Sequence, residues 1–189
     1  MAFGFELIIT TVIGLILIAI AVYIISVFNG LVRLKNNIRK SLANIDVLLR
    51  QRVDELPKLI ASVKGYMKHE RSVLTDLTKA RTDFLSAKTI QEKAKVDGII
   101  SGALKTLFAV AENYPNLKAN ENFIQLQGRI SGIENELADR REFYNDSVNT
   151  YNIRIQSFPD MFVARTLGYN NEDMFKATES EKKDVEVKF

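Results

Sequence analysis

The feature that most constrains this chain is an uncharged, apolar stretch at Leu7–Val27. A helix of about 20 apolar residues is long enough to cross the hydrocarbon core of a bilayer. The alternative is a cleaved secretory signal, which needs basic residues before the apolar run and a small-x-small cleavage site after it. Met1–Glu6 carries no Lys or Arg, and Ser26-Val27-Phe28-Asn29 is not such a site. The sequence therefore predicts an uncleaved transmembrane helix at residues 7–27.

Basic residues lie on one side of this stretch only. Arg33, Lys35, Arg39 and Lys40 follow it, and no Lys or Arg precedes it. Because positive charge favours the cytoplasmic side of a membrane, we expect a short extracellular N-terminus at residues 1–6 and a cytoplasmic domain after the helix. The absence of cysteine agrees with a reducing compartment. The four cations are also candidates for contact with anionic lipid headgroups, at about 1 kcal/mol each.

The charge balance of the remaining chain argues against nucleic-acid binding. The protein has 26 basic and 23 acidic residues, and only one acidic residue, Glu6, lies in the first 28 positions. Acidic and basic residues are interleaved along the predicted helices, whereas a nucleic-acid footprint clusters Lys and Arg. We therefore expect no nucleic-acid partner.

Apolar residues repeat at helical spacing through the rest of the chain. The first helix continues directly from the anchor, with a bend at most at Gly30, and Pro57 interrupts its pattern. Further helices are predicted at about 58–87, 89–113 and 118–158. We therefore predict an all-α fold, in which the transmembrane helix precedes an up-and-down four-helix bundle of long antiparallel helices at residues 28–169. Residues 170–189 are polar and predicted to form a flexible tail.

Pro57 leaves two arrangements open. If it marks a turn, which we favour, the fourth helix returns toward the bilayer and the apolar cluster Phe158–Leu167 dips into the membrane interface. If it is only a kink, the first two segments form one long rod and the cluster caps the bundle. Of the two fates of the cluster, we favour the cap.

Two pairs of glycines lie at matching distances on either side of Pro115. Gly98 and Gly102 precede it, and Gly128 and Gly132 follow it. In an antiparallel hairpin these pairs lie at the same height. We expect them to let the third and fourth helices approach closely, which offsets the cost of about 1 kcal/mol for each glycine within a helix. Chance spacing is the alternative.

The fourth helix ends in a heptad of large side chains, with an asparagine directly after two of its aromatic residues. The heptad consists of Tyr144, Val148, Tyr151, Ile155 and Phe158, and the asparagines are Asn145 and Asn152. A period of 3.5 residues is typical of a packed helical seam, as in a coiled coil. We interpret this stripe as core and not as a ligand-binding box.

Two segments are candidates for docking a protein partner. Asn116 and Lys118 lie in the loop after Pro115, where capping and turn formation also explain the residues. Near the C-terminus, Val185, Val187 and Phe189 alternate as in a peptide that adds a strand to a sheet edge. A disordered end is the alternative for this second segment.

Residues for catalysis are scarce. The chain has one histidine and no cysteine, which excludes zinc sites built only from His and Cys and excludes Cys–His nucleophilic pairs. Position 66, three before His69, is Tyr and not the Glu of a di-iron motif. Glu134 and Glu136 are interpreted as solvated charges. We predict no catalytic, cofactor-binding or metal-binding residue, and no small-molecule substrate.

Several motifs follow one another in a distinctive order. They are Phe28-Asn29-x-Leu31-Val32, Asn44-Ile45-Asp46-Val47, Arg52 through Pro57, Val63-Lys64-Gly65-Tyr66, His69-Glu70, Tyr114-Pro115-x-Leu117-Lys118-Ala119-Asn120-x-Asn122-Phe123, and Tyr144-Asn145, Tyr151-Asn152 and Phe158-Pro159. This series resembles the LemA family of bacterial membrane proteins. The resemblance implies a plasma-membrane protein with an extracellular N-terminus and a cytoplasmic bundle of up-and-down helices, and it implies no catalytic activity.

Together these features favour a noncatalytic, membrane-anchored scaffold or adaptor that presents a helical surface to protein partners, with homo-oligomerisation left open. The alternative is a self-assembling membrane-organising or lipid-sensing protein, which would use the anchor, the four cations and the cluster Phe158–Leu167.

Overall fold

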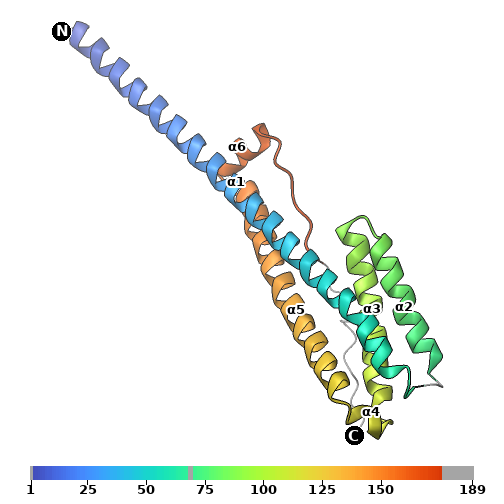
Figure 1. Ribbon diagram of the computed structural model, residues 1–189. Coiled ribbons are helices and arrows are strands. Elements are labelled where there is room, and N and C mark those ends of the chain that lie inside the picture. The colour runs from blue at the N-terminus through green and yellow to red at the C-terminus, as the bar shows by residue number, and fades with distance from the viewer. Residues whose placement is uncertain (1, 68–69, 176–189) are drawn as a thin grey trace, which may run out of the picture. The chain divides into compact units, whose positions relative to one another are not determined.

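The computed structural model of the protein describes residues 2–67 and 70–175, which are helical throughout apart from short connections (Figure 1). The helices are α1 (Ala2–Val63), α2 (Arg71–Ser86), α3 (Ile90–Ala111), α4 (Pro115–Lys118), α5 (Glu121–Gln156) and α6 (Asp160–Thr166). Within the described residues there is no strand. The prediction of an all-α fold is confirmed.

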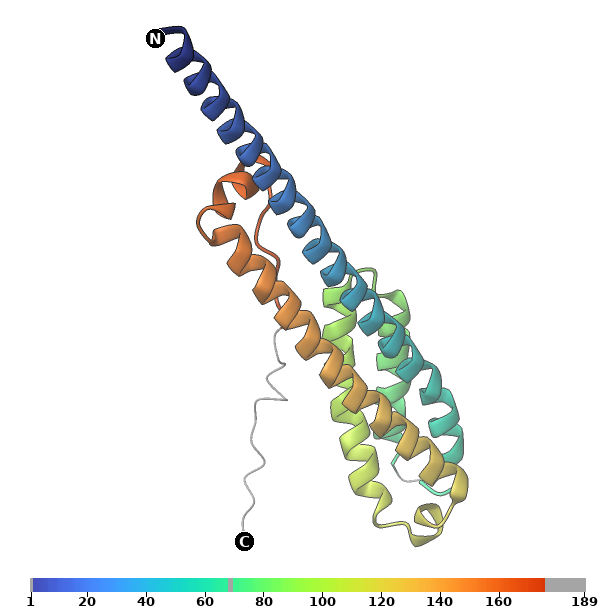
Figure 2. The same ribbon diagram turned by 90° about the vertical axis from the view of Figure 1, so that its left-hand side faces the viewer.

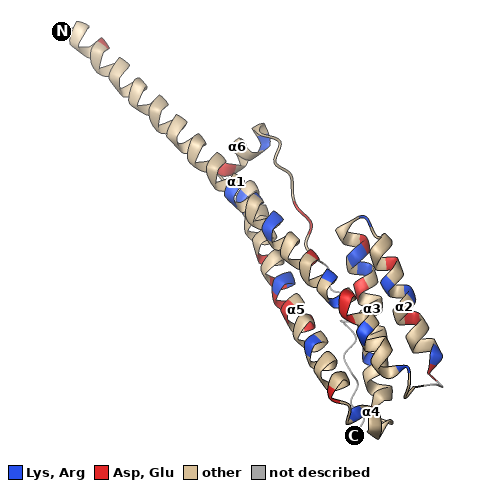
Figure 3. Cartoon of the chain, in the orientation of Figure 1, with Lys and Arg blue, Asp and Glu red and all other residues tan. Residues whose placement is uncertain are grey.

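Helix α1 changes character along its length. It is the one helix of the described residues that is long and apolar enough to span a membrane, and in its part from Phe3 to Ile25 the large apolar side chains are exposed. Figure 3 shows that basic side chains begin only after this part. From Leu31 onward α1 buries a stripe of apolar residues that includes Ile38, Ile45 and Leu49. The helix runs through Gly30 without a break, as the sequence predicts.

The turn expected at Pro57 is wrong, because Pro57 lies inside α1. A proline within a helix removes one backbone hydrogen bond and costs about 3 kcal/mol. Leu56 and Leu59, on either side of it, are completely buried, and this burial offsets the cost. The helix ends instead at Val63, before a turn at Lys64–Tyr66. The second helix therefore begins at Arg71, and the predicted start at residue 58 is also wrong.

The described residues form two compact units. The terminal unit comprises residues 2–41 and 143–174, and the hairpin unit comprises residues 42–142 and 175. Helices α1 and α5 contribute to both. In the hairpin unit α2 and α3 lie side by side as an antiparallel pair, and in the terminal unit the end of α5 lies along α1 (Figures 1 and 2).

Local capping explains where α3 and α5 begin. The Thr89 hydroxyl accepts a hydrogen bond from the Glu92 amide, and the Glu92 carboxylate accepts one from the Thr89 amide, which forms a capping box at the start of α3. At the start of α5 the Asn120 side chain accepts a hydrogen bond from the Phe123 amide at 3.1 Å. The expectation that an asparagine of this loop caps the following helix is confirmed.

Segments of four helices supply the apolar core of the hairpin unit. Its buried side chains include Ile45, Leu49, Val53, Leu56, Leu59 and Val63 of α1, Leu77 and Phe84 of α2, Ile100, Leu104 and Leu107 of α3, and Phe123, Ile130 and Leu137 of α5. Within each helix these residues recur three, four or seven positions apart, the spacing of one helix face. The buried apolar side chains of this unit therefore follow the helical periodicity of its sequence.

The predicted heptad near the end of α5 is buried except at its last position. Tyr144, Val148, Tyr151 and Ile155 are buried, whereas Phe158 is exposed. The expectation fails at Phe158 because α5 ends at Gln156 and Pro159 diverts the chain. The side chain of Phe158 therefore no longer follows the face of the helix.

The expected close approach at the glycine pairs is wrong for three of the four residues. Gly102, Gly128 and Gly132 are exposed, and a Cβ atom placed on any of them would meet no atom within 4 Å. Gly98 is half-buried. Helices α3 and α5 contact each other instead through other side chains, such as Asp97 with Arg141 and Phe108 with Phe123. The matching distances from Pro115 therefore do not mark a packed face.

Candidate functional site

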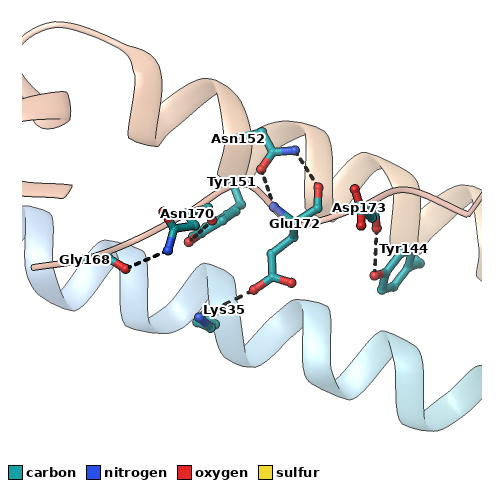
Figure 4. Close-up of polar contacts among 8 residues, drawn as sticks. All are labelled: Lys35, Tyr144, Tyr151, Asn152, Gly168, Asn170, Glu172 and Asp173. Carbon is teal, nitrogen blue, oxygen red and sulfur yellow. Dashed lines mark hydrogen bonds and ion pairs between the residues drawn. The ribbon is translucent and has the colours of Figure 1, made fainter. Parts of the chain in front are cut away.

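A strap of extended chain, residues 168–173, lies along α5 in the terminal unit (Figure 4). The Tyr151 hydroxyl donates to the Asn170 carbonyl at 2.9 Å, and the Tyr144 hydroxyl donates to the Asp173 carbonyl at 3.0 Å. The Asn152 side chain donates to the Glu172 carbonyl at 2.9 Å and accepts from the Glu172 amide at 3.0 Å. Asn152 thus pairs with both backbone groups of Glu172, as a neighbouring β-strand would.

The strap also contacts α1 through Lys35. The Lys35 ammonium lies 3.5 Å from the Glu172 carboxylate and 5.7 Å from the centre of the Tyr169 ring. Gly168 has a φ of 72°, which turns the chain sharply at the start of the strap. Lys35, predicted to face lipid, therefore has partners within the protein. The other predicted lipid-facing cations, Arg33, Arg39 and Lys40, are exposed on α1.

The expectation of a flexible tail from residue 170 does not hold for residues 170–173. Their backbone groups are bonded by Tyr144, Tyr151 and Asn152, three members of the tyrosine and asparagine pattern in α5. These side chains are placed by the heptad, because each tyrosine is buried with its hydroxyl directed to the strap. The aromatic stripe therefore contributes to the core and also binds an extended peptide segment.

The tyrosines of this site titrate at higher pH than usual. Burial raises the pKa of Tyr144 and of Tyr151, and the nearby Glu172 carboxylate adds to the effect. Because the pKa of each hydroxyl is higher in the folded than in the unfolded protein, folding favours the neutral form of the hydroxyl. The contribution of these hydroxyls is present below the ordinary tyrosine pKa and is lost as the pH rises through the folded-state value.

A second polar cluster joins the start of α6 to α1 in the terminal unit. Asp160 accepts a hydrogen bond from the Tyr23 hydroxyl and another from Arg154 Nε at 2.9 Å. Both interactions lower the pKa of the Asp160 carboxyl, the Tyr23 hydrogen bond more strongly. The Arg154 guanidinium lies so close to Gly30 that a Cβ atom there would be 2.6 Å from Nη1. Glycine at position 30 therefore makes room for this cation.

The hairpin unit contains a buried ionic network that connects three helices. Arg52 of α1 and Asp97 of α3 are each 1% exposed. Arg52 Nη1 lies 2.8 Å from Asp97 and donates to the Ser101 hydroxyl at 2.9 Å, while Arg141 of α5 donates to the other Asp97 oxygen at 2.7 Å. Glu134, which the sequence suggests is a solvated charge, lies 3.3 Å from Arg52 Nη2. The network therefore contains two guanidinium groups and two carboxylates, so its charges balance.

Sequence reasoning missed this network, although the sequence contains a signal for it. Asp97 stands in the same helical stripe as Ile100, Leu104 and Leu107, all of which are buried. A carboxylate within an apolar stripe requires a buried partner of opposite charge. Catalytic residue patterns do not point to Asp97, since the network contains no nucleophile or metal-ligand motif.

A groove of about 810 Å³ opens on the hairpin unit between the end of α1 and α2. Its lining residues are Ile60, Lys64, Met67, Arg71, Leu74, Thr75, Thr78, Lys79 and Thr82. The hydroxyls of Thr75, Thr78 and Thr82 donate to carbonyls of their own helix, so their polar ends are already satisfied. Among the described lining residues none is acidic. The groove therefore combines apolar surface with three cations.

The two predicted docking segments are placed as follows. Asn116 and Lys118 are exposed on α4, and Lys118 forms an ion pair with Glu112. Neither residue belongs to the groove on α2. Val185, Val187 and Phe189 lie outside the described residues, as does His69. The structure thus adds the groove as a docking candidate that the sequence analysis does not contain.

The comparisons with known proteins agree with the sequence motifs. The profile of the LemA family matches residues 41–189. Protein LemA of Metamycoplasma hominis is 30% identical over 164 residues, which cover 84% of this chain and 73% of the relative. Magnetosome protein MamQ 2 of Paramagnetospirillum magneticum is 22% identical over 175 residues, or 79% of this chain and 64% of the relative.

Magnetosome protein MamQ of Magnetospirillum gryphiswaldense is 20% identical over 185 residues, which cover 84% of this chain and 68% of the relative. None of these names denotes an enzyme. With the family profile matched over most of its length, an all-helical structure and a single candidate membrane span in the described residues, this chain belongs to the LemA family.

Proposed function

We propose that the protein is a noncatalytic scaffold of the bacterial plasma membrane, anchored by α1 with its N-terminus outside the cell. In this proposal the helices after the anchor form an up-and-down bundle in the cytoplasm and present a docking surface to a protein partner. The apolar part of α1, the cations that follow it and membership of the LemA family support the anchoring and the orientation.

The observation that carries the docking role is the groove on α2. Its apolar lining includes Ile60, Met67 and Leu74, and its cations are Lys64, Arg71 and Lys79. An apolar groove suits the apolar face of a helix, and three cations with no acidic residue among the described lining residues suit a negatively charged flank. We therefore assign this groove to an amphipathic helix of a partner protein that carries Asp or Glu beside its apolar stripe.

Site-specific crosslinking of the full-length protein in its native membrane tests this proposal. A photoreactive amino acid at Thr78 should crosslink to a peptide that is both amphipathic and acidic, identified by mass spectrometry. Leu74→Glu should abolish the crosslink, because it places a carboxylate on the apolar lining, and Lys79→Glu should weaken it by about tenfold, since reversal of one charge opposes an acidic partner.

Lys105→Glu is the matched control, because Lys105 is exposed on α3 and does not line the groove. It should leave the crosslink unchanged. Crosslinks only to a second copy of this chain would replace the scaffold proposal by self-assembly. Equal crosslinking in all three variants would remove the groove as the docking surface.

A membrane-organising or lipid-sensing role is the second candidate function. It is favoured by one observation, the exposed apolar side chains of α6 in the same unit as the predicted membrane span. Three relatives of this chain are named magnetosome proteins.

A further inference from the structure

Helix α6 and the turn before it expose apolar side chains that the core does not use. Phe158 is 77% exposed and Phe162 is 57% exposed, and their rings meet edge to face with centres 5.9 Å apart. Leu167, one turn further on, is exposed as well. Ala164 is buried and holds the opposite side of α6 against the protein. Two adjacent phenylalanine rings in water are unfavourable, so this surface requires an apolar environment.

Polar contacts fix α6 beside the end of the predicted membrane span. Tyr23, which belongs to the predicted span at residues 7–27, donates its hydroxyl proton to Asp160 at the first position of α6. Arg154, which also bonds Asp160, lies against Gly30 three residues beyond the span. All of these residues belong to the terminal unit. Tyrosine and arginine at this level are typical of the boundary between lipid and water.

The residues around the phenylalanine pair match an interfacial segment. Arg165 and Thr166 are exposed on α6 beside Phe162, and Arg33 is exposed on α1 three residues beyond Gly30. A helix of 7 residues is too short to cross the bilayer, and a helix with an apolar face and adjacent cations lies in the plane of the interface. Its cations favour anionic headgroups.

We infer that α6 is a second membrane contact, in which Phe158 and Phe162 insert into the headgroup region of the leaflet from which α1 emerges. This inference rests on the proposed anchoring of α1. It contradicts the expectation that the cluster Phe158–Leu167 caps the bundle, and it holds although Pro57 is not a turn. The occupant of the exposed surface is lipid, because the hydrogen bond from Tyr23 to Asp160 places the start of α6 beside the apolar part of α1.

The absence of tryptophan from the chain permits a direct measurement of depth. Full-length F162W, reconstituted in vesicles of neutral and anionic phospholipid, carries a single fluorescent tryptophan. Phospholipids brominated on the upper acyl carbons should reduce its emission by about half, because an interfacial helix places its apolar side chains ~5–10 Å into the headgroup and acyl boundary. The emission maximum of F162W in vesicles should also lie at a shorter wavelength than that of the fragment released from the vesicles into buffer by a protease.

Phe143→Trp is the matched control. Phe143 is 59% exposed on α5, close to the value for Phe162, but it precedes Phe158 by about four helical turns, or ~22 Å along the helix axis. Emission of F143W should be unaffected by the brominated lipid. I16W, within the apolar part of α1, reports separately whether the anchor is in the bilayer.

Quenching of F162W and I16W without quenching of F143W supports the inference. Quenching of I16W alone overturns it and leaves the anchoring intact, and equal quenching of F162W and F143W also overturns it, because the contact would then not belong to α6. If I16W is not quenched, the anchoring fails and the inference fails with it. F158W repeats the measurement should F162W lose helicity by circular dichroism.

Discussion

Two parts of helix α1 differ in which side chains they expose. Between Leu7 and Ile25 the exposed residues are uncharged and mostly apolar, whereas between residues 42 and 63 the exposed face carries charges such as Arg50 and Asp54 and the other face is buried. An exposed helix that is apolar all round is typical of a membrane span, whereas a striped helix packs against protein on one side and faces water on the other. One continuous helix can therefore combine a part suited to lipid with a part suited to a protein core and water.

The largest effect is expected when charged residues are placed in the apolar part of α1. Leu17 is 60% exposed and Val47, in the striped part, is 56% exposed. The double variant Ile16→Lys with Leu17→Lys should prevent stable insertion, because each lysine near the centre of a spanning helix costs about 3 kcal/mol. Carbonate extraction of cell membranes measures the loss as protein released to the supernatant.

The double variant Ala43→Lys with Val47→Lys is the control on the same helix. Both residues are exposed in the striped part, so the variant should remain in the membrane and change the free energy of unfolding by less than about 0.5 kcal/mol per site. Retention of both double variants in the membrane fraction would contradict a lipid environment for residues 16 and 17.

The next largest effect on stability is expected at the buried ion pair between Arg52, in the striped part of α1, and Asp97 of α3. Asp97→Ala leaves Arg52 buried without its closest carboxylate, and removal of one partner from a buried pair costs about 3–5 kcal/mol. Asp54→Ala breaks the exposed pair with Arg50 and should cost less than about 1 kcal/mol. Urea unfolding of the full-length protein in detergent, followed by circular dichroism, measures both. Equal costs would show that the network around Asp97 is solvated.

A smaller effect is expected at the strap in the terminal unit. Asn152→Ala removes both hydrogen bonds to the Glu172 backbone and should cost about 1–3 kcal/mol locally. Hydrogen exchange should show the Glu172 amide exchanging at least about tenfold faster, since 1.4 kcal/mol corresponds to a factor of ten. Gln156→Ala, which loses one exposed bond to Asn171, is the control and should leave that amide protected. An unchanged Glu172 amide in N152A would disprove the pairing.

The smallest effect is a gain in stability at the exposed glycines of the hairpin unit. Gly102→Ala, Gly128→Ala and Gly132→Ala should each stabilise the protein by up to about 1 kcal/mol, because alanine favours a helix and meets no neighbouring atom. Gly168→Ala should destabilise, because its φ of 72° is strained for any residue with a Cβ atom. Thermal unfolding measures all four. A loss of stability at residues 102, 128 and 132 would mean that this surface is packed against a partner.

Short-range patterns predicted much of the fold. The apolar run at 7–27, the limits of α3 and the capping of α5 by Asn120 all follow from the identity of residues within a few positions of one another. The predictions that failed required knowledge of distant partners. Pro57 remains in α1 because of the burial of Leu56 and Leu59, and three of the four paired glycines are exposed because α3 and α5 meet through other residues.

The candidate sites also have some features that are visible in the sequence and others that depend on distant partners. The cations after the span and the tyrosine and asparagine pattern of α5 are visible in the sequence, but their partners are not. Glu172 as the partner of Lys35 and of Asn152 became apparent only when the strap was placed on α5. The groove on α2 has no sequence motif, since its lining comes from two helices.

The sequence by itself determined that this protein is all-helical, has an apolar segment long enough to span a membrane, and belongs with the LemA family, because periodicity, run length and motif order are properties of the chain. Only the tertiary structure decided that α1 continues through Pro57, that Arg52, Asp97 and Arg141 share a buried network, and that α6 begins beside Tyr23. Burial and pairing depend on residues far apart in the chain, and their free energies outweigh the local preference of proline or of an isolated charge.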